Sequence, residues 1–310
     1  MVLKKGAEDL RKAFNARGVY VFVMTPFKMT KNRKGQHEVD LEGVERNIRH
    51  FSRVKGAKTM VLCGGSGEFH SLSEGEVREI AQAAVSGAEG RCKIVSGVGG
   101  PTPNAVRMAE AAQEAGCDAV LVMPHEGIVK HGERAIYEHH RAISKAIDIG
   151  LMPFRAPHQL LSIDLVKRLA GVANVIAIKE ESGAVDWVRT GVRVTGGGVP
   201  FITGGSENMI PYYYLAGAVG FTTGMANLTL LQSARLHGAA IRRDWRRAME
   251  WRDYFEPLTE ARRELGTPML KGGLEMMGLA GGPVRATGAV LDAAGRRRVR
   301  KMMKAKGLLL

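Results

Sequence analysis

The stretch Ala119-Val120-Leu121-Val122-Met123-Pro124 is apolar at every position. Continuous apolarity of this kind is typical of a parallel strand buried on both faces of its sheet, because a surface strand would alternate apolar and polar residues. Similar runs recur along the chain at spacings of roughly 20 to 40 residues, and each is followed by a stretch with helical periodicity. The pattern therefore predicts a series of βα units.

The chain contains eight such runs, at residues 19–27, 59–66, 93–99, 119–124, 150–157, 175–181, 200–205 and 220–227. Helix signals lie between them. Examples are the capping-box pattern Ser73-Glu74-Gly75-Glu76 and Ser162, which opens the helical stretch 163–169. Eight alternating units predict an α/β fold of the closed (β/α)₈ TIM-barrel type, with an open doubly wound sheet as the alternative.

Three further helical stretches follow the eighth unit, at residues 244–265, 269–277 and 292–304. No low-complexity linker or second core separates them from the barrel. We expect residues 1–240 to form the barrel with an N-terminal extension, and residues 241–310 to form a helical extension packed on it.

The chain has a formal net charge of +14, from 45 Lys and Arg against 31 Asp and Glu. Much of the excess lies in the pairs 242–243, 246–247 and 262–263 and in the tail 296–301. A basic surface can steer anionic substrates or hold nucleic acid. These charges alternate with Ala, Met and Leu and not with base-stacking aromatics, so we interpret them as solvated helix faces and expect no nucleic-acid partner.

No stretch reaches the roughly 18 to 20 consecutive apolar residues that a membrane span needs, and residues 1–17 do not resemble a secretory signal. We therefore expect a cytoplasmic protein with no membrane partner. Cys63, Cys92 and Cys117 lie in or beside apolar runs, which indicates reduced core thiols. No Cys or His spacing suggests a metal site.

In a barrel of this kind the active site lies at the carboxyl ends of the strands. Lys179 ends the run Val175-Ile176-Ala177-Ile178, so its amine is expected at the mouth of the barrel beside apolar surface. Partial desolvation lowers the pKa of a lysine, and the neutral amine is the form that attacks a carbonyl. Lys179 is therefore a candidate nucleophile, whereas a lysine at a strand end is ordinarily a solvated cap.

The second run ends in Gly64-Gly65-Ser66-Gly67-Glu68. Three glycines in four positions allow a tight turn that exposes backbone N–H groups, and such a turn binds anions. The Ser66 hydroxyl adds a donor. A carboxylate bound there would suit a 2-oxo acid whose keto carbon faces Lys179, although a plain tight turn gives the same sequence.

Together these features resemble the dihydrodipicolinate synthase and N-acetylneuraminate lyase superfamily, the pyruvate-dependent class I aldolases. The resemblance runs over nearly the whole chain. The matching strings are Thr25-Pro26-Phe27, Gly64 to Glu68, Ile178-Lys179-Glu180, Gly204-Gly205-Ser206-Glu207 and the region 268–285. The string Gly-Gly-Ser-Gly-Glu-Phe-His-Ser-Leu, with Gly97-Val98-Gly99-Gly100, is most similar to the 5-dehydro-4-deoxyglucarate dehydratase branch.

The resemblance implies a lyase in which Lys179 forms a Schiff base with a 2-oxo acid or sugar acid. It places the substrate's carboxylate at Gly65 and Ser66, and a further substrate contact at Gly205. Since the lysine supplies the electrophile, neither a metal nor an organic cofactor is implied. The family also implies a homotetramer built as a dimer of dimers.

Two positions depart from the family pattern. Glu126, in Pro124-His125-Glu126, stands where most members carry a proton-relaying tyrosine. A carboxylate can act as general acid or base if its pKa is raised toward neutrality. Proton transfer then falls to Glu126, to His125 or to the substrate's own carboxylate. The alternative is a protein with altered or lost catalysis that keeps the pocket for binding or regulation.

The second departure is Arg155, in the string Phe154-Arg155-Ala156-Pro157 that replaces the usual Tyr-Asn-x-Pro. A guanidinium at the mouth of the pocket offers a planar clamp for a second carboxylate of the substrate. A surface arginine is the equal alternative.

Overall fold

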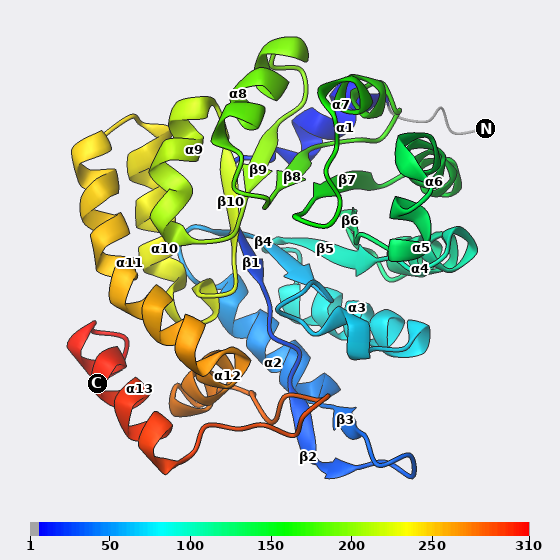
Figure 1. Ribbon diagram of the computed structural model, residues 1–310. Coiled ribbons are helices and arrows are strands. Elements are labelled where there is room, and N and C mark those ends of the chain that lie inside the picture. Colours follow the sequence, from blue (N-terminus) through cyan, green and yellow to red (C-terminus); the bar gives the residue numbers. More distant parts are fainter. Residues whose placement is uncertain (1–5, 310) are drawn as a thin grey trace.

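The computed structural model describes residues 6–309. Figure 1 shows a central ring of strands enclosed by helices, with the last helices gathered along one side. The strands of the ring are β1 (Gly18–Phe22), β4 (Ala57–Leu62), β5 (Lys93–Val98), β6 (Ala119–Val122), β7 (Gly150–Arg155), β8 (Ile178–Glu180), β9 (Phe201–Thr203) and β10 (Gly220–Thr223). Each of the eight predicted runs overlaps one of them, although β1 and β4 begin before their runs do.

These strands form a closed parallel barrel in the order β1-β10-β9-β8-β7-β6-β5-β4. Strand β1 closes the ring because it pairs with β10 through Gly18 and Gly220 and with β4 through Tyr20 and Thr59. The predicted (β/α)₈ barrel is confirmed, and the open doubly wound sheet is excluded.

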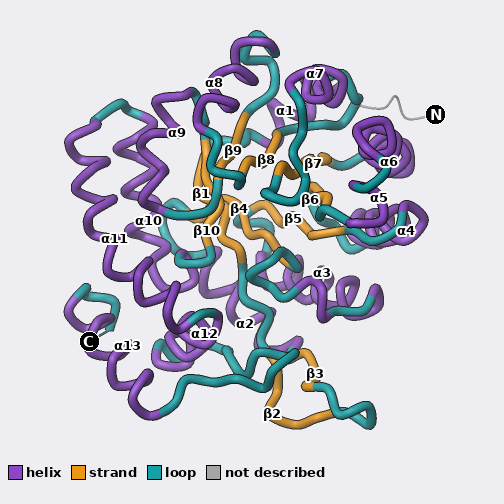
Figure 2. Tube along the Cα trace, in the orientation of Figure 1, coloured by secondary structure: helices purple, strands orange, loops and turns teal. Residues whose placement is uncertain are grey.

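The helices surround the strands, as the purple outer ring in Figure 2 shows. They are α2 (Leu41–Ser52), α3 (Glu74–Ala88), α4 (Thr102–Glu114), α5 (Glu126–Val129), α6 (Gly132–Ala146), α7 (Ile163–Ala170), α8 (Val185–Val194), α9 (Ile210–Ala216) and α10 (Ala226–Ile241), with short 3₁₀ turns η1 (Phe69–Ser71) and η2 (Glu207–Met209). The Ser73 capping box at the start of α3 is confirmed, since Ser73 and Glu76 bond reciprocally. Ser162 likewise caps α7 by accepting from the Leu165 N–H.

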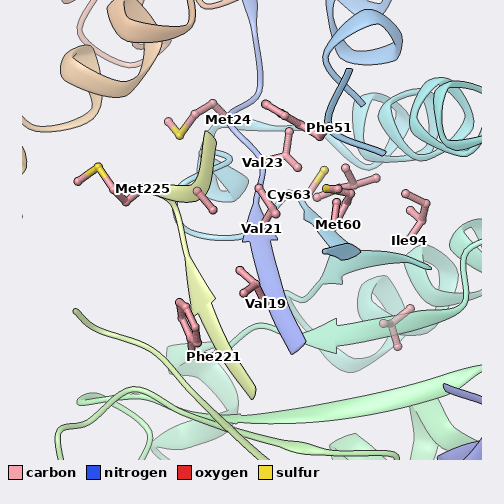
Figure 3. Packing of buried hydrophobic residues seen from close by; sticks show 14 of the residues in the cluster. Val19, Val21, Val23, Met24, Phe51, Met60, Cys63, Ile94, Phe221 and Met225 are labelled. Carbon is pink, nitrogen blue, oxygen red and sulfur yellow. The ribbon is translucent and has the colours of Figure 1, made fainter. Parts of the chain in front are cut away.

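The strands separate two apolar layers, because successive side chains point to opposite faces. In β1, Val19 and Val21 face the surrounding helices, where they pack in the cluster drawn in Figure 3 with Met60 and Phe221. Tyr20 and Phe22 belong to the separate cluster that includes Val61, Val95, Met152 and Ile202. The interior of the barrel is therefore a packed core and not a channel.

Helix α1 (Ala7–Phe14) packs at the amino ends of the strands. Its Phe14 joins the interior cluster, and the Arg11 guanidinium donates to the carbonyls of Ala170 and Val175 at 2.8 Å each. These bonds attach α1 to the end of α7 and to the segment that leads into β8. With its amino end covered in this way, the barrel is left open at the carboxyl ends of its strands.

Three helices follow the barrel, α11 (Trp245–Leu265), α12 (Thr267–Met276) and α13 (Ala293–Ala305), within a residue or two of the predicted stretches. Both α11 and α12 pack against α10. The antiparallel pair β2 (Phe27–Lys31) and β3 (His37–Val39) was not predicted: Phe27 was the end of the first run, and the residues after it were assigned to no element.

None of the helices in the described part of the chain is long and apolar enough to cross a membrane. The three cysteines are free, with Cys63 and Cys117 buried and Cys92 partly buried. Burial raises the pKa of Cys92 to about 11 and that of Cys117 to about 12, so both stay protonated thiols at neutral pH. The prediction of reduced core cysteines agrees with this arrangement.

Candidate active site

A cavity of about 430 Å³ opens at the carboxyl ends of the strands. Its wall combines residues from strand ends, from the loops after them and from α11. The members that matter below are Phe22, Gly65, Ser66, Phe154, Lys179, Glu181, Gly205, Glu207, Thr223, Gly224 and Arg262. The sequence predicted this end of the barrel as the site, and four of the predicted residues lie in one cavity: Gly65, Ser66, Lys179 and Gly205.

Lys179 lies in β8 with only 1% of its surface exposed. Its Nζ lies 3.4 Å from the centre of the Phe154 ring and 4.6 Å from that of Phe22. Burial in this apolar surround lowers the pKa of Lys179 from its ordinary value, although the neighbouring Glu181 and Glu180 act in the opposite direction. The amine is therefore easier to deprotonate than a surface lysine, as a nucleophile requires.

Glu181 forms an ion pair and hydrogen bond with the Nζ of Lys179. Its side chain is 37% exposed and lines the cavity, so it contacts both the lysine and the space where a ligand would lie. The sequence reasoning gave Glu181 no role. A signal was available, because residues two apart on a strand share a face.

Gly65 and Ser66 lie in the turn after β4, which is fixed from several sides. The Glu68 N–H donates to the Gly65 carbonyl at 3.1 Å, and the Thr25 hydroxyl donates to the Gly67 carbonyl at 2.6 Å. Glu68 itself has a left-handed backbone with φ of 59°. The Ser66 hydroxyl stays at the cavity wall, available to a ligand.

His125 and Glu126 follow β6 but do not line the cavity, whereas the preceding Pro124 does. Glu126 is the first residue of α5 and is exposed. His125 precedes the helix, and its Nδ1 is buried without a hydrogen-bond partner. The structure thus does not bring these two residues together with Lys179, and their proposed role in proton transfer stays a prediction.

Arg155 is also absent from the cavity wall. It is buried at the end of β7, where its Nη1 pairs with Glu180 at 2.8 Å and its guanidinium stacks 4.5 Å over the Trp187 ring. Glu180 also accepts from the Ser182 backbone N–H at 2.7 Å. Through these contacts Arg155 holds the loop after β8 in place. Its proposed role as a clamp for a second carboxylate of the substrate stays a prediction.

Arg262 on α11 was interpreted as part of a solvated helix face, and this interpretation is wrong. The side chain is partly buried and lines the cavity, and its Nη2 donates to the Ser66 hydroxyl at 3.4 Å. Other arginines of this helix, such as Arg246 and Arg247, are exposed as expected. No sequence signal distinguishes Arg262, because only the packing of α11 places it at the mouth of the barrel.

Comparison with known proteins agrees with this geometry. The family model described as the dihydrodipicolinate synthetase family matches residues 15–306. A 4-hydroxy-tetrahydrodipicolinate synthase of Methanothrix thermoacetophila is 27% identical, over 93% of this chain and 96% of its own. A probable 5-dehydro-4-deoxyglucarate dehydratase of Rhizobium meliloti is 30% identical, over 84% of this chain and 88% of its own.

Among solved structures, dihydrodipicolinate synthase from Aquifex aeolicus superposes with a TM-score of 0.84 at 26% identity, covering 95% of this chain and 99% of that one. The match to the family model extends from the end of α1 to the end of α13, so it includes the barrel, the cavity and the C-terminal helices. The chain therefore belongs to the dihydrodipicolinate synthetase family.

Proposed function

We propose that the chain is a lyase that forms a Schiff base between Lys179 and a 2-oxo acid or sugar acid. The observation that carries the proposal is the buried amine of Lys179, which lies at the wall of a cavity between two aromatic rings with a carboxylate in contact. The relatives named as a synthase and as a dehydratase support a lyase of this superfamily.

In the proposed reaction the substrate's carboxylate binds at the Gly65–Ser66 turn. The neutral Nζ of Lys179 attacks the keto carbon, whose oxygen takes up a proton, and the resulting carbinolamine loses water to give a protonated imine. The imine accepts the electron pair released when the neighbouring carbon loses a proton or a carbon–carbon bond breaks, and an enamine results. Loss of a β-hydroxyl as water, or protonation of the enamine, gives the imine of the product. Addition of water to this imine then breaks its bond to the Lys179 nitrogen, which releases the product carbonyl and the free amine without a metal or organic cofactor.

Glu181 is the carboxylate placed to move the protons in these steps. It contacts the Lys179 amine, so it can accept the ammonium proton before attack and return it to the departing hydroxyl. Because Glu126 is exposed and outside the cavity, the missing tyrosine is better replaced by Glu181. The homotetramer implied by the family resemblance and the cytoplasmic location expected from the sequence stay predictions.

Reduction with borohydride in the presence of pyruvate tests the proposal. The enzyme is expected to gain the mass of one reduced pyruvate unit, and peptide mapping should place it on Lys179. A panel of 2-oxo acids that leaves the protein unlabelled would reject Schiff-base chemistry and leave a binding or regulatory protein with the same pocket.

A Glu181→Gln variant is expected to form the trapped imine about 10²- to 10³-fold more slowly at neutral pH, the usual range for loss of a general acid or base. The amide keeps the shape of the side chain but cannot accept the lysine proton. Stopped-time labelling followed by mass spectrometry measures the rate. Glu126→Gln should be measured beside it, since a large loss in Glu126→Gln with none in Glu181→Gln would assign the proton transfer to Glu126.

A further inference from the structure

Arg262 is a cation in the cavity wall that has no acidic partner. Its Nη1 is buried and makes no hydrogen bond, and its Nη2 reaches only the neutral Ser66 hydroxyl, at 3.4 Å. Between residues 6 and 309 no carboxylate forms an ion pair with it. Two other buried arginines of the described chain contrast with it, because Arg155 pairs with Glu180 at 2.8 Å and Arg285 pairs with Glu76 at 2.5 Å.

The two carboxylates whose charges act on Arg262 are those of Glu207 and Glu181, and both already have other partners. Glu181 contacts Lys179, and Glu207 accepts a hydrogen bond from the Thr223 hydroxyl. Burial also raises the pKa of Glu207, which weakens it as a counter-charge. A guanidinium stays protonated in proteins, so an unpaired one at a buried position favours an anion supplied from outside.

The Ser66 hydroxyl and the Arg262 guanidinium lie close together beside Gly224, which also lines the cavity. A Cβ added to Gly224 would come within 2.8 Å of the Ser66 Oγ and 3.1 Å of the Arg262 Nη1. The hydroxyl and the guanidinium therefore converge over the same point of the backbone, after β10. A carboxylate at this part of the wall can accept from the Ser66 hydroxyl with one oxygen and from the Arg262 guanidinium with the other, in a charge-assisted hydrogen bond.

We propose that Arg262 is a specificity-determining residue: it adds a charged donor beside the Ser66 hydroxyl, and the two form an anion subsite that selects the ionised carboxylate of a 2-oxo acid over neutral carbonyl compounds. The proposal rests on the proposed function for the identity of the reacting carbonyl. The subsite joins the C-terminal helix α11 to the turn after β4, so the part of the chain beyond the barrel contributes directly to substrate choice.

The test compares pyruvate with its neutral amide, pyruvamide, in borohydride trapping. For Arg262→Gln the pyruvate concentration for half-maximal labelling is expected to rise about 10- to 100-fold, the effect of losing a hydrogen bond to a charged group. The labelling rate at saturating pyruvate should change little, and labelling by pyruvamide should not change. Arg262→Lys should recover part of the pyruvate affinity, because it restores the charge without the planar fork.

Arg246→Gln is the matched control, since it removes the same charge from an exposed position on the same helix. It should leave half-saturation by pyruvate unchanged. Thermal unfolding reports on folding: removal of an unpaired buried charge should not lower the melting temperature. Unchanged pyruvate affinity in Arg262→Gln, or an equal loss for pyruvate and pyruvamide, would overturn the proposal.

Lactate separates this inference from the proposed function, because it has the carboxylate but no carbonyl. Calorimetric titration should show lactate binding to the wild-type protein and at least about tenfold weaker binding to Arg262→Gln. If the wild-type protein binds lactate in this way but is never labelled by 2-oxo acids, the Schiff-base function fails and the anion subsite stands. If lactate binds both proteins equally, the subsite fails whatever the labelling shows.

Discussion

The Lys179→Met variant is expected to form no trapped adduct with pyruvate and to lose lyase activity by a factor on the order of 10⁴ or more, as for removal of a covalent nucleophile. Methionine has no nitrogen to attack the keto carbon. Its length and polarisable sulfur suit the space between Phe22 and Phe154, where the lysine Nζ lies 3.4 Å from the Phe154 ring centre. Labelling with mass spectrometry measures the first effect and steady-state turnover the second.

The same variant should remain folded. Lys179 is 1% exposed, and a buried ammonium is costly to desolvate. Its partner Glu181 is 37% exposed, so water can solvate that carboxylate when the lysine is removed, and an apolar side chain of similar volume is expected to keep or raise the melting temperature. This separates loss of chemistry from loss of structure. An adduct of undiminished yield in Lys179→Met, mapped to another lysine such as the buried Lys271, would contradict the assignment.

The pH dependence of labelling gives a second check on the same residue. Because burial lowers the pKa of Lys179, the reactive neutral amine should accumulate at a lower pH than in an ordinary lysine, whose pKa is about 10.4. The wild-type labelling rate should therefore rise with pH and level off below that value. A rate that keeps rising through pH 10 would indicate a solvated lysine.

Much of this fold was predictable because the strands and helices of a parallel barrel have a regular, recognisable sequence pattern. Each buried strand lies in a short apolar run, as in Val120-Leu121-Val122, and a helical stretch follows each run, in some cases with a recognisable cap such as Ser73. Lys179 and Ser66 were found for the same reason: both follow such runs, and the carboxyl ends of barrel strands meet in one place.

Glu181 was missed and Arg262 was misinterpreted because the apolar runs do not encode the direction in which a neighbouring side chain points. Glu126 follows β6 but begins α5 and does not line the cavity, so its place after a strand does not by itself test its role in proton transfer. Arg262 is far from the barrel in sequence and reaches the cavity only because α11 packs over η2 and α9. Such long-range packing leaves no local pattern, since the partly buried Arg262 is followed directly by the exposed Arg263.

The turn that carries Ser66 is held by the C-terminal region through a buried charge network. Glu68, at the end of the turn, pairs with the Nζ of Lys271 at 2.5 Å and accepts from the Arg285 backbone N–H at 2.8 Å. Lys271 is 1% exposed and also donates to the Pro283 carbonyl at 2.6 Å. Two of the strings that carry the family resemblance, Gly64–Glu68 and region 268–285, are thus in direct contact in the fold.

Lys271→Met is accordingly expected to lower the free energy of unfolding by about 3 to 5 kcal/mol, because it leaves the Glu68 carboxylate and the Pro283 carbonyl buried without the ammonium. Urea unfolding with an unchanged slope measures the loss. Lys167→Met is the matched control, since Lys167 pairs with Asp164 at an exposed site and should change stability by less than about 1 kcal/mol.

The double variant Lys271→Met/Glu68→Gln decides whether the loss comes from the broken pair. Removing both charges leaves no unpaired ion, so the double variant should be more stable than Lys271→Met alone, which a double-mutant cycle would report as coupling of the two residues. Because Glu68 anchors the turn, both variants should also require more pyruvate for half-maximal labelling than Lys167→Met does. A Lys271→Met protein as stable as the control would mean that the turn after β4 holds its shape without the C-terminal helices.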